Sequence, residues 1–269
     1  MERLGAKMQR FDWERLKVEV YRTREEAGRA AAAAVGDELK RLNRTRESIE
    51  VIFATGASQL ATLGALTATQ DLPWSRVNGF HMDEYVGISP EHPASFRRYL
   101  RSDLTGRVTM HRFHEIDGNA DPEGECRRYA EELRAADPQL CLLGIGENGH
   151  LAFNDPAVAD FQDPLDMKVV DLDDDCKRQQ VAEEWFANVD EVPAQALTLT
   201  IPALLRVPKL IVSVPGPRKA KIVRRTLTEA ISIACPATIL RTHPDATVYL
   251  DAESAAELDG ETFEHAWRA

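Results

Sequence analysis

The stretch that most constrains the fold is residues 141–156, CLLGIGENGHLAFNDP. An apolar run ends at Leu143 and a glycine-rich turn follows at once, as at the carboxyl end of a buried parallel strand. His150 stands at the mouth of this turn, with Asp155 five residues on. Ligands of open α/β sheets bind at such strand ends, and a histidine there is suited to proton transfer near neutral pH. On spacing alone, an ordinary glycine turn with a locally bonded histidine is an equally open interpretation.

Strand and helix patterns alternate along the chain. Strands are expected over residues 16–21, 49–54, 77–82, 108–113, 140–143, 167–172, 209–214 and 246–250, with a strand passing into a helix over 196–205. Helices are expected over residues 24–42, 59–68, 95–101, 122–135, from 177 onward, from about 218 to 230 and in the polar tail. No long linker divides the chain. We therefore expect one domain over residues 1–269, an α/β fold of three layers with a Rossmann-like, mostly parallel sheet and helices on both faces.

The charge balance excludes several classes of partner. Acidic residues outnumber basic ones by 44 to 33, which gives a formal net charge of −11. Nucleic acids and anionic membranes select basic surfaces, so neither is expected as a partner. If the ligand is a small anion, the chain must gather its basic groups locally. A homo-oligomer is possible, because no stretch of the sequence decides the oligomeric state.

Cysteine usage and the N-terminal segment indicate the compartment. The four cysteines form no CxxC pair and show no zinc spacing, and nothing suggests a disulfide framework. The segment MERLGAKMQRFDWERL lacks the apolar core of a signal peptide, and no apolar run approaches the length of a membrane span. We expect a cytoplasmic protein. His111 and His114 point to opposite faces of an expected strand, so no metal site is predicted from them.

Two turns that follow expected strands are candidate phosphate sites. Thr55, Gly56, Ala57 and Ser58 lie between a buried strand and a helix, an arrangement that presents backbone N–H groups to an anion. The turn PGPRKA places Lys219 in the first turn of another helix. Each turn is also compatible with an ordinary strand–helix connection when it is taken alone.

Four separated motifs together resemble the glucosamine-6-phosphate deaminase branch of the sugar-phosphate isomerase/lactonase superfamily. They are ATGAS, FHMDEYVGI followed by HPASF, GIGENGHLAFNDP, and PGPRKA, in the order of that family. The resemblance implies conversion of glucosamine 6-phosphate and water to fructose 6-phosphate and ammonia. It also implies that the reaction uses no metal and no organic cofactor.

The resemblance assigns catalytic roles to residues of the second and third motifs. Asp83 matches the base that moves a proton between C2 and C1, and a carboxylate is chemically suited to that task. His150 matches the residue that opens the sugar ring, and Asn148 and Asp155 match its supporting partners.

The resemblance also implies a set of binding residues. The positions that match the family's substrate and phosphate contacts are Thr55, Gly56, Ala57, Ser58, Gly149 and Lys219. A further phosphate-binding arginine falls at Lys177 or Arg178, of which we choose Arg178. Glu84 is included as a contact of the substrate amine, although it could equally hydrogen-bond within its own loop.

Three positions depart from the family pattern. Many members have Glu at the position of Asp155, and part of the family has Asp at that of Asn148. The shorter Asp155 carboxylate leaves the exact hexosamine phosphate open. Asp166 stands where allosterically activated members carry a basic residue for a phosphorylated effector. We therefore expect no activation by N-acetylglucosamine 6-phosphate.

Three alternative functions are left open. A 6-phosphogluconolactonase would need a similar histidine but no base at C2, and FNDP together with Asp83 argues against it. A deaminase of another hexosamine 6-phosphate, for example the galactosamine isomer, is not distinguished by the sequence. A non-catalytic sugar-phosphate sensor should have lost Asp83 or His150 and should carry a DNA-binding segment, and both residues are present.

Overall fold

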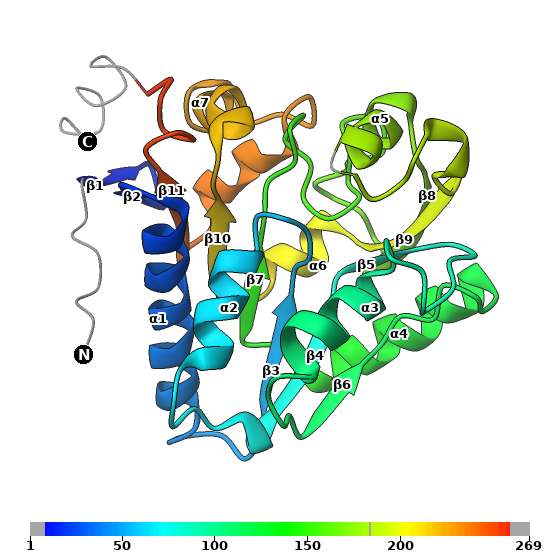
Figure 1. Cartoon of the computed structure of the whole chain (residues 1–269), viewed down its shortest axis with the longest axis horizontal. Coiled ribbons are helices and arrows are strands. Elements are labelled where there is room, and N and C mark those ends of the chain that lie inside the picture. The colour runs from blue at the N-terminus through cyan, green and yellow to red at the C-terminus, as the bar shows by residue number, and fades with distance from the viewer. Residues whose placement is uncertain (1–8, 183, 259–269) are drawn as a thin grey trace.

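The computed structural model describes residues 9–182 and 184–258, and in this part of the chain eight strands form one large sheet. The spatial order is β1-β2-β11-β10-β7-β3-β4-β6 (Figure 1). The strands are β1 (Gln9–Trp13), β2 (Leu16–Tyr21), β3 (Ile49–Phe53), β4 (Val77–His81), β6 (Arg112–His114), β7 (Leu140–Leu143), β10 (Lys209–Val214) and β11 (Ala246–Asp251). Paired neighbours run parallel except β1 and β2, which form an antiparallel hairpin. The expected α/β fold with a mostly parallel sheet is confirmed.

The helices follow the expected alternation. They are α1 (Arg24–Leu42), α2 (Leu60–Ala68), α3 (Phe96–Leu100), α4 (Pro122–Ala136), α5 (Asp174–Ala182), α6 (Ile201–Leu205) and α7 (Ala220–Thr228). Shorter helical turns are η1 (Trp74–Arg76), η2 (Arg101–Thr105), η3 (Val189–Glu191), η4 (Pro217–Lys219) and η5 (Pro236–Thr242). The polar helix expected in the C-terminal tail lies outside the described residues. Among the described helices, none has the length and apolarity that a bilayer crossing requires.

The large sheet has a hydrophobic core on each face, and β7 contributes to both. Leu140 and Leu142 belong to the cluster that includes α1 and α2, whereas Cys141 and Leu143 belong to the cluster that includes α4, α6 and α7. This division follows from the alternation of side chains along a strand. All four side chains are fully buried, and burial of each leucine contributes about 2 kcal/mol. The rigid centre of the sheet thus lies directly beneath the glycine-rich turn.

A second, smaller sheet lies beside the large one and was not predicted. It contains β5 (Asp83–Tyr85), β9 (Gln195–Leu199) and β8 (Met167–Asp171), paired antiparallel in that order. Only Met82 separates the end of β4 from the start of β5. Asp83, which directly follows the strand expected over residues 77–82, therefore begins a strand of the small sheet.

Candidate active site

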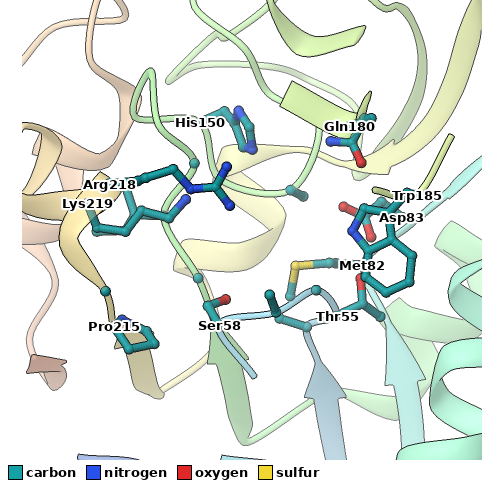
Figure 2. A pocket seen from close by; sticks show the side chains of 18 of the residues that line it. Thr55, Ser58, Met82, Asp83, His150, Gln180, Trp185, Pro215, Arg218 and Lys219 are labelled. Atoms are coloured by element: carbon teal, nitrogen blue, oxygen red, sulfur yellow. The ribbon is translucent and has the colours of Figure 1, made fainter. Parts of the chain in front are cut away.

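A pocket opens where four neighbouring strands of the large sheet end (Figure 2). The segments that follow β3, β4, β7 and β10 all line it, because the carboxyl ends of parallel strands meet at one edge. The polar and charged lining residues are Arg24, Thr55, Ser58, Asp83, His150, Gln180, Arg218 and Lys219. The structure thus brings together residues that are up to 195 positions apart in the chain, Arg24 to Lys219.

Glycines let the turn after β7 close around His150. The imidazole lies so near Gly146 that a Cβ built there would be 2.2 Å from ring atoms. Gly149 has a positive φ of 95°, a conformation that side chains with a Cβ rarely adopt, and a Cβ there would meet the sulfur of Cys235 at 2.8 Å. Gly149 is not among the pocket-lining residues and shapes the turn, and its expected substrate contact stays a prediction.

His150 is held by the partners that the sequence proposed. Its Nδ1 lies 3.0 Å from Oδ1 of Asp155, and its backbone N–H donates to Oδ1 of Asn148 at 3.0 Å. The Asn148 amide also donates to Asp155 at 2.7 Å. Because a carboxylate only accepts, Nδ1 of the neutral ring carries the proton and Nε2 is left as a base. Asn148 and Asp155 lie behind His150 and orient it, while His150 itself lines the pocket.

Asp155 is ionised in this arrangement. Burial alone raises the pKa of its carboxyl group, but the charge and hydrogen bond of His150, the Asn148 amide and the Cys176 thiol together lower it below the ordinary value. Cys176 comes from α5 and is buried, and it was not expected to take part. Nothing in the sequence indicates this contact, because a buried helical cysteine ordinarily packs as a small apolar residue.

Asp83 carries the one carboxylate among the described residues that line the pocket. Its side chain is 6% exposed, and Oδ1 has no hydrogen-bond partner among the described residues. Burial raises its pKa well above the ordinary value, and the neighbouring charge of Glu84 raises it further. A buried carboxyl group with a raised pKa and a free oxygen is suited to exchange a proton with a ligand.

Glu84 does not reach the pocket, so its expected contact with the substrate amine is not supported. It is fully buried and accepts hydrogen bonds from the hydroxyl of Ser95 and from the backbone N–H groups of Phe96 and Arg97. It also pairs with the buried Arg97 guanidinium at 3.3 Å. Side chains alternate along a strand, so Asp83 and Glu84 face opposite ways. Glu84 anchors its own loop, which is the other role that the sequence left open.

The turn at residues 55–58 has the geometry of an anion site. Gly56 has a φ of 87°, and α2 begins directly after the turn without a side-chain cap at Gln59. The N–H groups of the first helical turn are therefore available to a ligand. Gln59 instead uses its amide to donate to the carbonyl of Leu143 at 2.9 Å, which fixes the turn to the end of β7. Thr55, Gly56, Ala57 and Ser58 all line the pocket as expected.

Three cationic side chains line the pocket around the turn after β10. Lys219 was expected, whereas Arg218 and Arg24 were not. Arg218 also pairs with Glu147 at 3.3 Å, and Arg24 reaches across from α1 to lie beside Gly216. A basic residue in the first turn of a helix opposes the helix dipole, and this was the signal in the sequence that could have identified Arg24. The acidic chain does gather positive charge locally.

Helix α5 and the segment after it differ from the expectation as well. Arg178 is exposed on α5 and is not among the lining residues. Gln180 from the same helix and Trp185 beyond it do line the pocket. An isolated helical glutamine has no sequence signature of function, so its place depends on how α5 packs. No group of His, Cys, Asp and Glu side chains that could hold a metal ion occurs within residues 9–182 and 184–258.

An oriented histidine, an uncompensated carboxylate and a cluster of cations at the carboxyl edge of a parallel sheet define an α/β protein with a site for a small anionic ligand. A family model described as glucosamine-6-phosphate isomerases/6-phosphogluconolactonase matches residues 22–249. A glucosamine-6-phosphate deaminase of Exiguobacterium sp. is 36% identical over 188 residues, which cover 69% of this chain and 71% of that relative. The chain belongs to this family of sugar-phosphate isomerases and lactonases.

One solved structure agrees with this assignment, and a more distant one shows the same fold. A monomeric glucosamine-6-phosphate deaminase matches with a TM-score of 0.81 at 30% identity, covering 89% of this chain and 99% of that one. The 6-phosphogluconolactonase of Thermotoga maritima matches with a TM-score of 0.72 at 20% identity, covering 88% and 99%, and shares the fold.

Proposed function

We propose that this protein deaminates glucosamine 6-phosphate, converting it with water to fructose 6-phosphate and ammonia. The observation that carries the proposal is that Asp83 and His150 line the same pocket. Asp83 offers a carboxylate oxygen without a hydrogen-bond partner among the described residues, and His150 offers Nε2 as a base. A lactonase would use the histidine, but lactone hydrolysis needs no base at C2 and so gives Asp83 no chemical role. The names of the relatives at 30% identity or more support the same reaction.

The phosphate group is proposed to bind at the edge of the pocket opposite Asp83. Backbone N–H groups of the 55–58 turn and the ammonium of Lys219 would hold its oxygens. Arg24 and Arg218 add positive charge at the same edge, as Figure 2 shows for Arg218 beside Lys219. This arrangement places the sugar carbons farthest from the phosphate near Asp83 and His150.

His150 is proposed to open the sugar ring. Its Nε2 takes the proton of the C1 hydroxyl and delivers it to the ring oxygen as the C1–O5 bond breaks, which leaves an aldehyde at C1. Asp155 stabilises the imidazolium that forms between these two transfers, because its carboxylate is ionised and accepts from Nδ1. Asn148 keeps Asp155 in place.

Asp83 is proposed to move the proton from C2 to C1. Its carboxylate takes the C2 proton, the C2–H electron pair forms a C1–C2 double bond, and the carbonyl pair moves to O1. The C2 ammonium gives one proton to O1, and Asp83 returns its proton to C1. The resulting iminium at C2 adds water and releases ammonia. The positive charge of the substrate amine favours the ionised form of Asp83 at the moment of transfer.

The test is ammonia release from glucosamine 6-phosphate, with fructose 6-phosphate measured by a coupled assay. Galactosamine 6-phosphate and 6-phosphogluconolactone should be offered to the same preparation. We expect ammonia and fructose 6-phosphate in equal amounts. Hydrolysis of the lactone alone would overturn the proposal in favour of the lactonase branch, and binding without turnover would indicate a sensor.

The same proposal includes the domain organisation of the enzyme and its cellular compartment. Residues 1–269 would act as one catalytic unit, because the pocket draws on segments that follow strands of the large sheet and on β5 of the small one. All four cysteines are unpaired and buried, which suits a reducing cytoplasm.

A further inference from the structure

Gln180 is a pocket residue that the reaction described above does not use. It lies near the end of α5, is 7% exposed and lines the pocket. Its Oε1 accepts a hydrogen bond from the hydroxyl of Tyr85 at 2.7 Å. With the oxygen edge of the amide held in this way, the nitrogen edge points into the pocket (Figure 2).

Tyr85 is a rigid support for this orientation. Its side chain is fully buried between the rings of Phe96, Phe153 and Phe186, with centroid separations of 5.2 to 5.4 Å. Because packing fixes the ring of this tyrosine, its hydroxyl group has one position. The Gln180 amide is therefore set before any ligand arrives, as electrostatic stabilisation of a reaction requires.

The position of Gln180 assigns it to the reacting end of the substrate. Figure 2 places it on the side of the pocket where Asp83 lies, away from Lys219 and Ser58. A phosphate held at the cationic edge would thus leave C1 and C2 within the space between Asp83, His150 and Gln180. In that placement Gln180 would face the carbons whose bonds change.

The chemistry of the amide selects the atom that it contacts. An amide N–H only donates, so it cannot bond to a C2 ammonium group, which also only donates. Two oxygens, O1 on C1 and O3 on C3, neighbour C2, and negative charge develops only on O1 as Asp83 takes the C2 proton. We propose that the Gln180 Nε2–H donates a hydrogen bond to O1 of the open-chain substrate and stabilises this charge, with Tyr85 as its positioning residue. The amide keeps both of its protons, and O1 receives its proton from the ammonium group as before. This inference rests on the proposed deaminase function.

Kinetics of three variants test the proposal. Gln180→Met keeps the volume and removes the donor, and loss of one such donor typically lowers kcat by about 100-fold. We expect KM to rise by no more than about 10-fold, less than kcat falls, since the bond to neutral O1 of the bound substrate strengthens as charge develops there. Tyr85→Phe keeps the aromatic packing and should lower kcat in the same direction by about 10-fold. The matched control is Gln162→Met, an exposed glutamine outside the pocket, which should leave both constants unchanged.

Binding of two unreactive hexitol probes tests the contact directly. The probes are 2-amino-2-deoxyglucitol 6-phosphate, which retains O1, and its 1-deoxy counterpart, which lacks it. The wild-type protein should prefer the first by about 10-fold, the equivalent of one hydrogen bond, and Gln180→Met should bind both equally. If Gln180→Met does not fold, the reduced preference of Tyr85→Phe decides the question.

The outcomes separate the two proposals. A wild-type protein that releases no ammonia overturns the deaminase function. A wild-type protein that is active, with a Gln180→Met variant that keeps kcat or keeps the preference for O1, overturns the contact with O1 alone. A variant that raises KM and leaves kcat intact also contradicts it, because Gln180 would then bind the ground state only.

Discussion

Glu84 accepts hydrogen bonds from several donors, whereas Oδ1 of its neighbour Asp83 accepts none from the described residues. The two carboxylates are consecutive in the chain, yet Glu84 accepts from Ser95, from backbone N–H groups and from Arg97, whereas Asp83 Oδ1 has no partner within the described residues. Because side chains alternate along β5, Glu84 points toward Ser95 and Arg97 whereas Asp83 points into the pocket. The contrast leads to different expectations for two adjacent substitutions.

Asp83→Asn should abolish turnover and raise stability. Loss of a general base typically lowers kcat by about 100- to 10,000-fold. The pKa of folded Asp83 lies above its ordinary value of 3.8, so the native state loses stability as pH rises from that value to the raised pKa. The asparagine variant escapes this loss. Its urea midpoint should exceed that of the wild type at pH 7, and the gap should narrow as pH falls. A midpoint below the wild-type value would contradict the uncompensated state of Asp83.

Glu84→Gln should lower the stability of the folded protein. It leaves the buried Arg97 guanidinium without its nearest carboxylate, and removal of one partner of a buried pair costs about 3 kcal/mol. The remaining ion pair of Arg97 with Asp117 limits the loss. Urea denaturation of the two variants in parallel is the measurement. Equal stability of both would show that the two acids share one environment.

The pH dependence of kcat/KM should report the raised pKa of Asp83. The free enzyme needs Asp83 as a carboxylate, so kcat/KM should fall on the acid side at a pH well above 3.8. Glu84 is one cause of the raised pKa, so the acid limb of any folded, active Glu84→Gln enzyme should shift to lower pH. A limb that stays in place in this variant would assign it to another group.

Arg24→Met and Lys219→Met should each raise KM for the phosphorylated sugar. A hydrogen bond to a charged group contributes about 1.5 to 3 kcal/mol, so each change should raise KM about 10- to 100-fold. Added salt should raise the wild-type KM more than that of either variant. Arg29→Met, an exposed change on the same helix as Arg24, is the control and should have no effect. An unaltered KM in Arg24→Met would remove Arg24 from the phosphate site.

The enzyme should not respond to a phosphorylated effector. Asp166 is buried and pairs with Arg134 and with Arg206, the latter at 2.5 Å, so it neutralises basic side chains where activated relatives carry a basic residue. We expect hyperbolic kinetics that N-acetylglucosamine 6-phosphate does not change at saturating concentration. A fall in the half-saturation concentration on its addition would contradict this expectation.

The features of the large sheet that follow from local chemistry were predictable. Continuous apolar runs such as 140–143 identified its buried strands, and glycines such as Gly149 identified turns that only glycine can form. The same turns carried His150 and the residues of the 55–58 segment into one pocket, with Asp155 bonded to His150 behind it, because parallel strands end at one edge.

The remaining features depend on contacts between distant segments. β5 is only three residues long, and its pairing with β9 leaves no local periodicity to detect. The edge strand β1 reads QRFDW, whose charges mask its alternation. Gln180 reaches the pocket because Tyr85 lies beneath it, a relationship across 95 residues that neither sequence segment reveals.

The junction at Met82 joins two parts of the pocket that belong to different sheets. The turns proposed to bind the phosphate follow strands of the large sheet, whereas Asp83 belongs to the small sheet and is joined to β4 through this single residue. A slight tilt of the small sheet would change the gap between the base and the sugar while the phosphate stays anchored. On the proposed function, substitutions in the small sheet would therefore change which sugar reacts and leave the proposed phosphate site as it is.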